Sequence, residues 1–274
     1  MSVLQKLLTI NPRYVYLVVA VAVIFPMVWD LRLPTVTSPP VEMLYKEIES
    51  LPPQSRIILS MDYDPSTVPE LHPMSAALLR QCFAKGIRVF GMTLNIQGQS
   101  LGVEIMDRIA KEFNIPNDGS QYVFVGFRPG PVIIQIGEDI IETFQTDFQK
   151  RDLRSLPMMV GVKNLDQFEL CISLSGTSVG YSWIATPGTR YRKKIAVGVT
   201  GILVSNFYPY LQSGQLVGML GGLKGAAEYE NLIQHEDKAK QGMGSQSAAH
   251  ILIILLIIAG NIIYFVQRRQ AESK

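Results

Sequence analysis

The chain has 274 residues, of which 47% are hydrophobic, and its 25 Lys and Arg residues exceed its 23 Asp and Glu residues by only two charges. So small a net charge, with aromatic residues that are not interleaved with Lys and Arg, argues against nucleic-acid binding. The two cysteines, Cys82 and Cys171, fall in a predicted helix and a predicted strand. We interpret them as buried thiols, and a bridge between them would neither require nor exclude an oxidising compartment.

Two apolar runs, one near each terminus, predict membrane spans. The first lies within residues 13–33 and carries Tyr14, Tyr16 and Trp29 at positions typical of interfacial aromatics. A cleaved signal peptide is the alternative for this run. The second run, Ala248 to Val266, has 19 residues, which at about 1.5 Å per residue cover the roughly 30 Å core of a bilayer.

The basic residues of the two tails predict the orientation in the membrane. Lys6 and Arg13 precede the first apolar run, and Arg268, Arg269 and Lys274 follow the second. Because Lys and Arg favour the cytoplasmic side, we expect an integral membrane protein with two spans, both termini in the cytoplasm and the intervening domain outside.

The segment between the two runs is long enough for one medium-sized domain. Its linker to the second run is polar and contains glycine, which is typical of a flexible connection. The predicted segments are a short tail (1–12), the first transmembrane helix (13–33), a tether with a lead-in helix (34–55), an α/β domain (56–234), a flexible linker (235–247), the second transmembrane helix (248–266) and a basic tail (267–274).

Strand and helix patterns alternate in the first half of the domain. Arg56 to Met61, Ile87 to Leu94 and Gln121 to Phe127 have strand patterns, separated by helical patterns over Glu70 to Lys85 and Ser100 to Phe113. Short joins between such elements predict one mostly parallel sheet with right-handed crossovers. The alternation resembles Rossmann- or flavodoxin-like sheets, a resemblance that concerns fold and not function.

The second half of the domain has less regular patterns. Pro131 to Ile136 is either a hairpin partner or the start of a helix that reaches Phe148. Pro157 to Val162 and Glu169 to Leu174 both look like strands, but they lie too close in sequence for a parallel crossover. We therefore expect an antiparallel pair, or one member outside the sheet. The remaining predicted elements are a short helix (Val179 to Ala185), a strand (Lys194 to Thr200) and a long helix (Asn206 to Gln234).

Polar loops follow the predicted strands, and ligands of open α/β sheets bind at the carboxyl ends of strands. Asp62 and Asp64 could hold a hard cation or share a proton, but Asp-Tyr-Asp-Pro is equally typical of a strand-to-helix turn. The Ser-Gly-Thr loop could present backbone N–H groups to an anion or simply cap a helix, and it matches no P-loop or dinucleotide motif. The candidate ligand-binding residues are Asp62, Asp64, Asn95, Ser175, Gly176, Thr177 and Thr200.

Glycines recur at small-residue spacing within the predicted long helix. Gly214, Gly218 and Gly222 are four residues apart, and Gly221 and Gly225 form a second pair. A glycine inside a helix costs about 1 kcal/mol relative to alanine, so a close backbone approach should compensate. We favour packing against the protein's own sheet, with a helix contact between subunits as the alternative.

A basic run, Arg190, Arg192, Lys193 and Lys194, leads into the last predicted strand. Tracing the chain direction, we expect both tethers to join the amino edge of the sheet, where this run lies. The run is then a candidate site for anionic lipid headgroups, and a solvated charge run is the alternative.

The histidines and cysteines of the sequence form no recognisable catalytic motif. None of His72, His235 and His250 has the setting of a catalytic base, and no H-E-x-x-H or C-x-x-C motif occurs. We therefore predict a non-enzymatic, double-anchored membrane protein whose α/β domain binds a partner or small ligand, as a membrane-assembly component or a sensor. Its expected partners are the lipid bilayer and further copies or other membrane proteins, and the sequence names no cofactor. The alternative is a membrane-bound enzyme that uses the polar loops, with a metal at Asp62 and Asp64.

Overall fold

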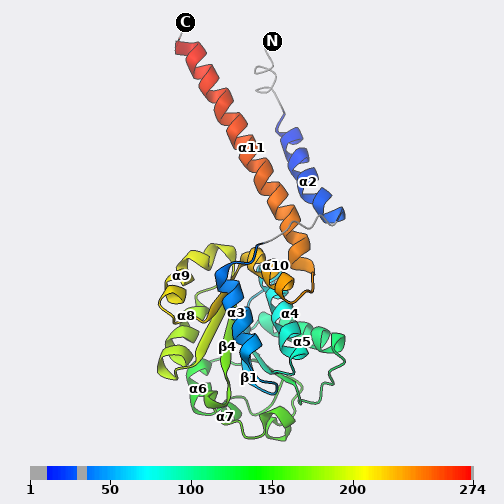
Figure 1. The fold of residues 1–274 in the computed structure, drawn as a ribbon, viewed down its shortest axis with the longest axis vertical. Helices are drawn as coiled ribbons and strands as arrows, with labels where there is room; N and C mark the ends of the chain where they lie inside the picture. Colours follow the sequence, from blue (N-terminus) through cyan, green and yellow to red (C-terminus); the bar gives the residue numbers. More distant parts are fainter. Residues whose placement is uncertain (1–10, 30–35, 273–274) are drawn as a thin grey trace. The chain divides into compact units, whose positions relative to one another are not determined.

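The computed structural model describes residues 11–29 and 36–272. The chain forms two compact units, one made of its terminal segments (Met1–Pro34 and Lys240–Lys274) and the other of Thr35–Ala239 (Figure 1). The second unit contains every strand of the described residues and is taken first.

The α/β unit is built on one six-stranded sheet in which all strands are parallel, in the order β3-β2-β1-β4-β5-β6. This confirms the expected parallel α/β fold. The order is that of Rossmann-type sheets, and it reverses direction between the neighbours β1 and β4. The strands are β1 (Arg56–Asp62), β2 (Arg88–Thr93), β3 (Tyr122–Phe127), β4 (Leu170–Ser175), β5 (Lys194–Val199) and β6 (Gly218–Gly221).

Helices cover both faces of the sheet, and almost every strand residue is therefore buried. One core cluster joins Ile58 of β1 and Phe90 of β2 to Trp183 and Phe207. Alternate residues such as Leu59 point to the opposite face. The first face carries α6 (Val132–Glu138), α7 (Ile140–Phe144), α8 (Val179–Trp183), the π-helix η4 (Ile184–Arg190) and α9 (Val204–Gln212), and the second carries α3 (Pro39–Ser50), α4 (Val68–Ala84), α5 (Gly98–Glu112) and α10 (Gly222–Leu232).

Of the two alternatives predicted for the segments before β5, the antiparallel pair is wrong, and the placement of one member outside the sheet is confirmed. Pro157–Met159 forms a short 3-10 helix, η2, while Leu170–Ser175 is β4 and pairs in parallel with β1 and β5. Helices α6 and α7 with the 3-10 turns η1 (Leu153–Ser155), η2 and η3 (Leu165–Gln167) supply the long crossover that a parallel strand needs. Pro131 to Ile136 accordingly belongs to the start of a helix, α6, and not to a hairpin.

The single long helix expected over Asn206 to Gln234 is also wrong. The segment forms α9, then β6, then α10, with the 3-10 turn η5 (Gly201–Leu203) before α9. Gly214 and Gly222 have positive φ angles of 75° and 58°, which a glycine adopts without a steric penalty and which a continuous helix does not contain.

The glycines of this segment pack closely inside their own fold. A Cβ at Gly218 would lie 2.6 Å from the Leu44 backbone nitrogen, and one at Gly221 would lie 2.6 Å from Val204 Cγ2. A Cβ at Gly225 would lie 3.1 Å from the Leu220 backbone. Close approach to the protein's own sheet is therefore present, but the glycines do not share one helix face, and the argument for a subunit contact through such a face is lost.

Both ends of the α/β unit meet helix α10. The Ser38 backbone N–H donates to Glu228 Oε2 at 3.0 Å, and the Ala239 backbone N–H donates to Glu230 Oε1 at 3.1 Å. At the other end of α3, Glu47 pairs with Lys194 at the start of β5 at 2.7 Å. Helix α3 thus runs antiparallel to the strands, and the expectation that the tether joins the amino edge is wrong, because the chain reaches that edge only after α3.

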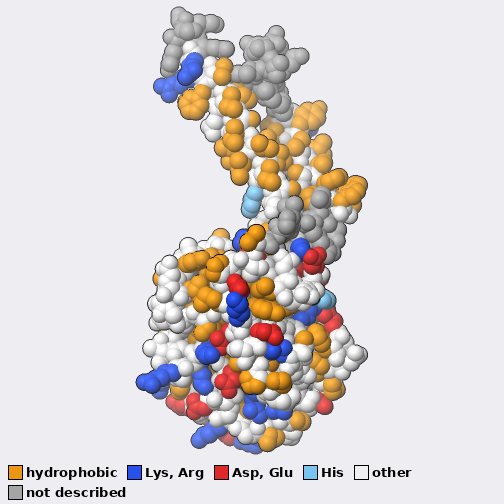
Figure 2. Space-filling view, in the orientation of Figure 1, with side chains coloured by type: hydrophobic (Ala, Val, Ile, Leu, Met, Phe, Trp, Pro, Cys, Tyr) orange, Lys and Arg blue, Asp and Glu red, His pale blue; other side chains and the backbone are white. Residues whose placement is uncertain are grey.

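The terminal unit contains α2 (Pro12–Val28) and α11 (Lys238–Glu272). Within α11, Lys238–Val266 is long and apolar enough to cross a membrane, and none of its apolar window is buried (Figure 2). Helix α2 is apolar but has only 17 residues, and its N-cap is Asn11, whose side chain accepts a hydrogen bond from the Arg13 backbone N–H. The segment expected to be a flexible linker is helical from Lys238 onward. Lys6 and Lys274, used in the orientation argument, lie outside the described residues.

Candidate functional site

The strand order reverses between β1 and β4, and the loops that follow these two strands contact each other at this point. A Cβ at Gly176 would lie 2.6 Å from Thr67 Cγ2. On the other side of β1, Gly98 begins α5 directly against the strand end, where a Cβ would lie 2.6 Å from the Met61 carbonyl oxygen. At the position where Rossmann-type domains bind dinucleotides, these loops therefore pack closely against one another and against the end of β1.

Asp62 lies beneath these loops as a buried carboxylate, 1% exposed. It accepts hydrogen bonds from the Leu94 backbone N–H at 2.6 Å, from Ser60 Oγ at 2.7 Å and from Ser173 Oγ at 3.2 Å. Burial raises the pKa of Asp62 to about 6, and these hydrogen bonds oppose a larger shift. Asp62 therefore ties β1 to β4 and to the end of β2, and it titrates close to neutral pH.

Asp64 is in a different environment. It is only partly buried and accepts hydrogen bonds from the Ser66 backbone N–H at 2.8 Å and from Ser66 Oγ at 2.6 Å. The hydroxyl hydrogen bond and then the amide hydrogen bond lower its pKa. Within the described residues Asp62 and Asp64 share no hydrogen-bond partner, and the hydrogen bond from the Ser66 backbone N–H gives Asp64 a turn-forming role. Residues 11–29 and 36–272 contain no group of three or more His, Cys, Asp or Glu side chains placed to hold a metal ion.

The other predicted ligand residues lie at the same sheet edge, but most of them bond within their own turns. Ser175 Oγ lies 2.9 Å from Thr177 Oγ1 and accepts from the Thr177 backbone N–H at 3.0 Å. Asn95 Oδ1 accepts from the Gln97 backbone N–H at 3.0 Å. Thr200 is buried, and its hydroxyl has no hydrogen-bond partner in the described part of the chain. These loops are therefore mainly turn and cap structures.

A pocket of about 520 Å³ opens at the carboxyl ends of β2 and β3. Arg128 is its one charged lining residue, and Ser182 of α8 and Thr186 of η4 contribute hydroxyls. Across the described residues, the side chains of these three form no hydrogen bond or ion pair. The full lining is Leu94, Phe127, Arg128, Pro129, Gly130, Pro131, Val132, Ile133, Ile134, Ser182 and Thr186.

A second pocket, of about 480 Å³, lies between α3, α4 and the end of α5. Its charged groups already pair with one another. Lys85 Nζ lies 3.0 Å from Glu49 Oε1, and Arg80 Nε lies 2.8 Å from Glu112 Oε2. The Arg128 pocket is the better candidate for a ligand because its polar groups are unpaired.

A hydrogen-bonded chain that the sequence did not reveal lies on the opposite face of the sheet. Tyr63 Oη is 2.9 Å from Ser75 Oγ and 3.0 Å from His72 Nδ1, and His72 Nε2 is 3.0 Å from Glu104 Oε2. Burial lowers the pKa of His72 and raises that of Tyr63. Because Tyr63 is 1% exposed, we interpret this chain as a structural link that holds α4 and α5 to the end of β1.

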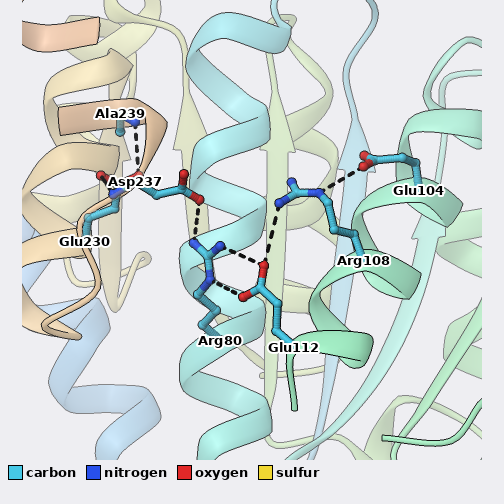
Figure 3. Close-up of polar contacts among 7 residues, drawn as sticks. All are labelled: Arg80, Glu104, Arg108, Glu112, Glu230, Asp237 and Ala239. Carbon is cyan, nitrogen blue, oxygen red and sulfur yellow. Dashed lines mark hydrogen bonds and ion pairs between the residues drawn. The ribbon is translucent and has the colours of Figure 1, made fainter. Parts of the chain in front are cut away.

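Figure 3 shows that Glu104 and Glu112 of α5 continue this chain of contacts through two arginines. Arg108 Nε lies 2.9 Å from Glu104 Oε1, and Arg108 Nη1 lies 3.8 Å from Glu112 Oε1. Arg80 donates two hydrogen bonds of 2.8 and 3.0 Å to the Glu112 carboxylate, and its Nη1 lies 2.8 Å from Asp237 Oδ2. Arg80 is 5% exposed, so these ion pairs are only weakly screened by solvent.

Glu230 completes this junction between the domain and α11. Its buried carboxylate accepts from the Asp237 backbone N–H at 3.0 Å and from the Ala239 backbone N–H at 3.1 Å (Figure 3). These are backbone donors at the start of a helix, where no helical carbonyl is available to accept from them. The first turn of α11 is thus capped from within the domain.

The basic run before β5 is partly engaged by the protein itself. Lys194 pairs with Glu47, and Lys193 Nζ donates to the carbonyl oxygens of Asp166 and Phe168, both at 3.2 Å. Arg190 lies over the Tyr191 ring at 5.3 Å. Arg192 is exposed. The tether enters α3 at the end away from this run, so the expected position of the run beside both tethers no longer supports lipid binding. Lipid binding by this run stays a prediction.

Comparison with known proteins adds little. No family model and no curated protein matches the chain. Among solved structures, a trehalose-6-phosphate synthase, OtsA, matches with a TM-score of 0.31 and 11% identity, covering 80% of this chain and 43% of that one. This chain therefore spans less than half the length of that structure, and a similarity of this size carries no argument about function.

Proposed function

We propose that this protein is a membrane-anchored binding protein whose α/β domain holds a small molecule in the Arg128 pocket, as the ligand-binding part of a sensor. The observation that carries the proposal is the set of three unpaired polar side chains, those of Arg128, Ser182 and Thr186, around one otherwise apolar pocket. The pocket opens at the carboxyl edge of a parallel sheet, and its volume is in the range of small-molecule sites.

The lining favours binding over catalysis. It contains no Asp, Glu, His, Cys or Lys side chain to act as an acid, base or nucleophile. Asp62 is buried, and its carboxylate accepts a hydrogen bond from the backbone N–H of the lining residue Leu94. The rival proposal, an enzyme with a metal at Asp62 and Asp64, gains no support from two carboxylates that share no partner.

The junction at Arg80 and Glu230 supports the sensor part of the proposal. It fixes the chain up to Ala239, and α11 continues from there without a break. A change within the domain would therefore reach the first turn of α11 through Arg80 and Asp237. The proposal includes α2 as a second anchor and the domain on the extracytoplasmic side, as the basic tails suggest.

Native mass spectrometry of the full chain in lipid nanodiscs tests the proposal. We expect a small-molecule adduct, or a ligand from a screened panel that raises the unfolding temperature. Ser182→Trp, which fills the pocket, should abolish the adduct or the shift, while Ser205→Trp, at an exposed position on α9, should preserve it. Binding that survives Ser182→Trp would place the ligand elsewhere and contradict the proposal.

A further inference from the structure

We infer that the ligand of the Arg128 pocket is an amphipathic monoanion, with one carboxylate or phosphate group attached to an apolar body. This inference rests on the proposed function and specifies its ligand class. The pocket has one positive charge and no acidic lining residue, so its charge balance favours an anion and disfavours a cation or a zwitterion.

The anionic group is expected at the Arg128 guanidinium. This side chain is half-buried, and it has no carboxylate partner among the described residues. Its planar donors match the paired oxygens of a carboxylate or phosphate. The Ser182 and Thr186 hydroxyls, which line the same pocket from α8 and η4, are further donors to an anionic oxygen.

The body of the ligand is expected to be apolar because seven lining side chains are apolar: Leu94, Phe127, Pro129, Pro131, Val132, Ile133 and Ile134. Ile134 is 41% exposed. Inorganic phosphate or a sugar phosphate would leave Ile134 in water, whereas an apolar body would bury it. A neutral apolar molecule would instead leave Arg128 desolvated and unpaired.

Tryptophan fluorescence gives a local readout. Trp183 is fully buried next to the lining residue Ser182, and the second tryptophan of the sequence is Trp29. In a Trp29→Phe background, the tryptophan emission of the full-length protein in nanodiscs therefore comes from Trp183, the sequence neighbour of the pocket residue Ser182. The ligands to titrate are octanoate, octan-1-ol, acetate and inorganic phosphate, with octyl phosphate and 2-naphthoate to compare head groups and apolar bodies.

We expect octanoate to cause a saturable fluorescence change, and octanol, acetate and phosphate to require far higher concentrations. Arg128→Gln should weaken octanoate binding about ten- to a hundredfold, the usual effect of losing a hydrogen bond to a charged group. Arg128→Lys should restore part of the affinity. Arg192→Gln is the matched control, because Arg192 is exposed and lies outside the pocket, and it should leave the titration unchanged. A preference for octanoate over 2-naphthoate would indicate an acyl chain, and the reverse a compact aromatic acid.

The outcomes separate the two proposals. If octanol binds as tightly as octanoate and Arg128→Gln has no effect, the ligand class is wrong while the binding function stands. If none of the probes binds but the mass measurement still finds a ligand that Ser182→Trp removes, the ligand class is again wrong. If neither measurement detects binding, both proposals fail.

Discussion

Asp62 is a residue whose ionisation opposes folding. Its pKa rises from 3.8 to about 6, so between these values the folded protein holds a proton that the unfolded chain has lost. The free energy of unfolding should therefore fall as pH rises through this window, by about 3 kcal/mol in all, and then level off. Asp62→Asn removes this contribution, and its stability relative to the parent should rise from pH 4 to pH 7.

Thermal unfolding of the full chain across pH 4 to 8 measures this effect. Asp64→Asn is the control and should show no comparable pH dependence in this range, because hydrogen bonds from Ser66 lower the pKa of Asp64 and its titration lies below pH 4. The stabilisation from Asp64 is present above its ordinary pKa and is lost as pH falls below it. If the stability of Asp62→Asn changed with pH in the same way as that of the parent, the assignment of a raised pKa to the buried Asp62 carboxyl group would be contradicted.

At the scale of residues, sequence patterns located the polar sheet edge but not the pocket. Asp62 and Ser175 end buried strands, Asn95 and Thr200 come after buried strands, and chain order alone places such residues at one edge. The pocket requires Leu94, Arg128 and Ser182 to meet, and these belong to segments that only the folded structure brings together. No local spacing rule connects them, and Arg128-Pro129-Gly130 looks like a plain turn.

Among the elements, β6 depends on one close contact. A Cβ at Gly218 would lie 2.6 and 2.7 Å from the Leu44 backbone nitrogen and Cα, and backbone atoms cannot move aside as a flexible side chain can. Gly218→Ala should therefore lower the free energy of unfolding by about 1 to 3 kcal/mol. Thermal or denaturant unfolding of the full chain measures this cost.

Gly201→Ala is the matched control, since its Cβ would meet only Glu70 Oε2 at 3.7 Å, an ordinary contact. Equal unfolding temperatures for the two variants would show that the Leu44 backbone of α3 does not pack closely against Gly218 of β6. The sequence could not separate β6 from a helix because four residues are too short to show strand alternation. The positive φ angles of Gly214 and Gly222, which delimit the segment, are not visible as a spacing pattern.

The junction of α10 with α11 predicts how fast the backbone amides of Asp237 and Ala239 exchange hydrogen. Glu230→Ala removes the acceptor of the Asp237 and Ala239 backbone N–H groups. Hydrogen exchange at these two amides should accelerate by about tenfold or more, in line with the loss of hydrogen bonds to a charged group. Arg80→Gln should have a similar effect at Asp237 through loss of the ion pair.

Lys46→Gln is the control for this measurement, because Lys46 forms an exposed pair with Glu42 within α3, and exposed pairs contribute little. Unchanged exchange at Asp237 and Ala239 in both Glu230→Ala and Arg80→Gln would mean that the domain does not fix the start of α11. The route from the pocket domain to the membrane helix, and with it the sensor proposal, would then lose its mechanical basis.

At the scale of the whole molecule, the number of spans and their orientation are testable without removing the native cysteines. Cys82 and Cys171 are buried, and burial raises the pKa of each thiol to about 12. Thiols that are buried and protonated react slowly with maleimides. New cysteines at Lys111, an exposed residue of α5, and at the terminal positions Ser2 and Ser273 can therefore be labelled in intact cells against a quiet background.

Two spans with cytoplasmic tails predict that an impermeant maleimide labels Lys111→Cys, and labels Ser2→Cys and Ser273→Cys only after the cells are permeabilised. Labelling of Lys111→Cys and Ser2→Cys, with Ser273→Cys protected, would mean that α11 crosses the membrane alone and that the 17 residues of α2 do not span it. Labelling of Ser273→Cys with Lys111→Cys protected would place the domain in the cytoplasm, because a single crossing by α11 separates these two positions. The Arg128 pocket would then meet cytoplasmic amphipathic anions instead of external ones, and a sensor of the outside would be excluded.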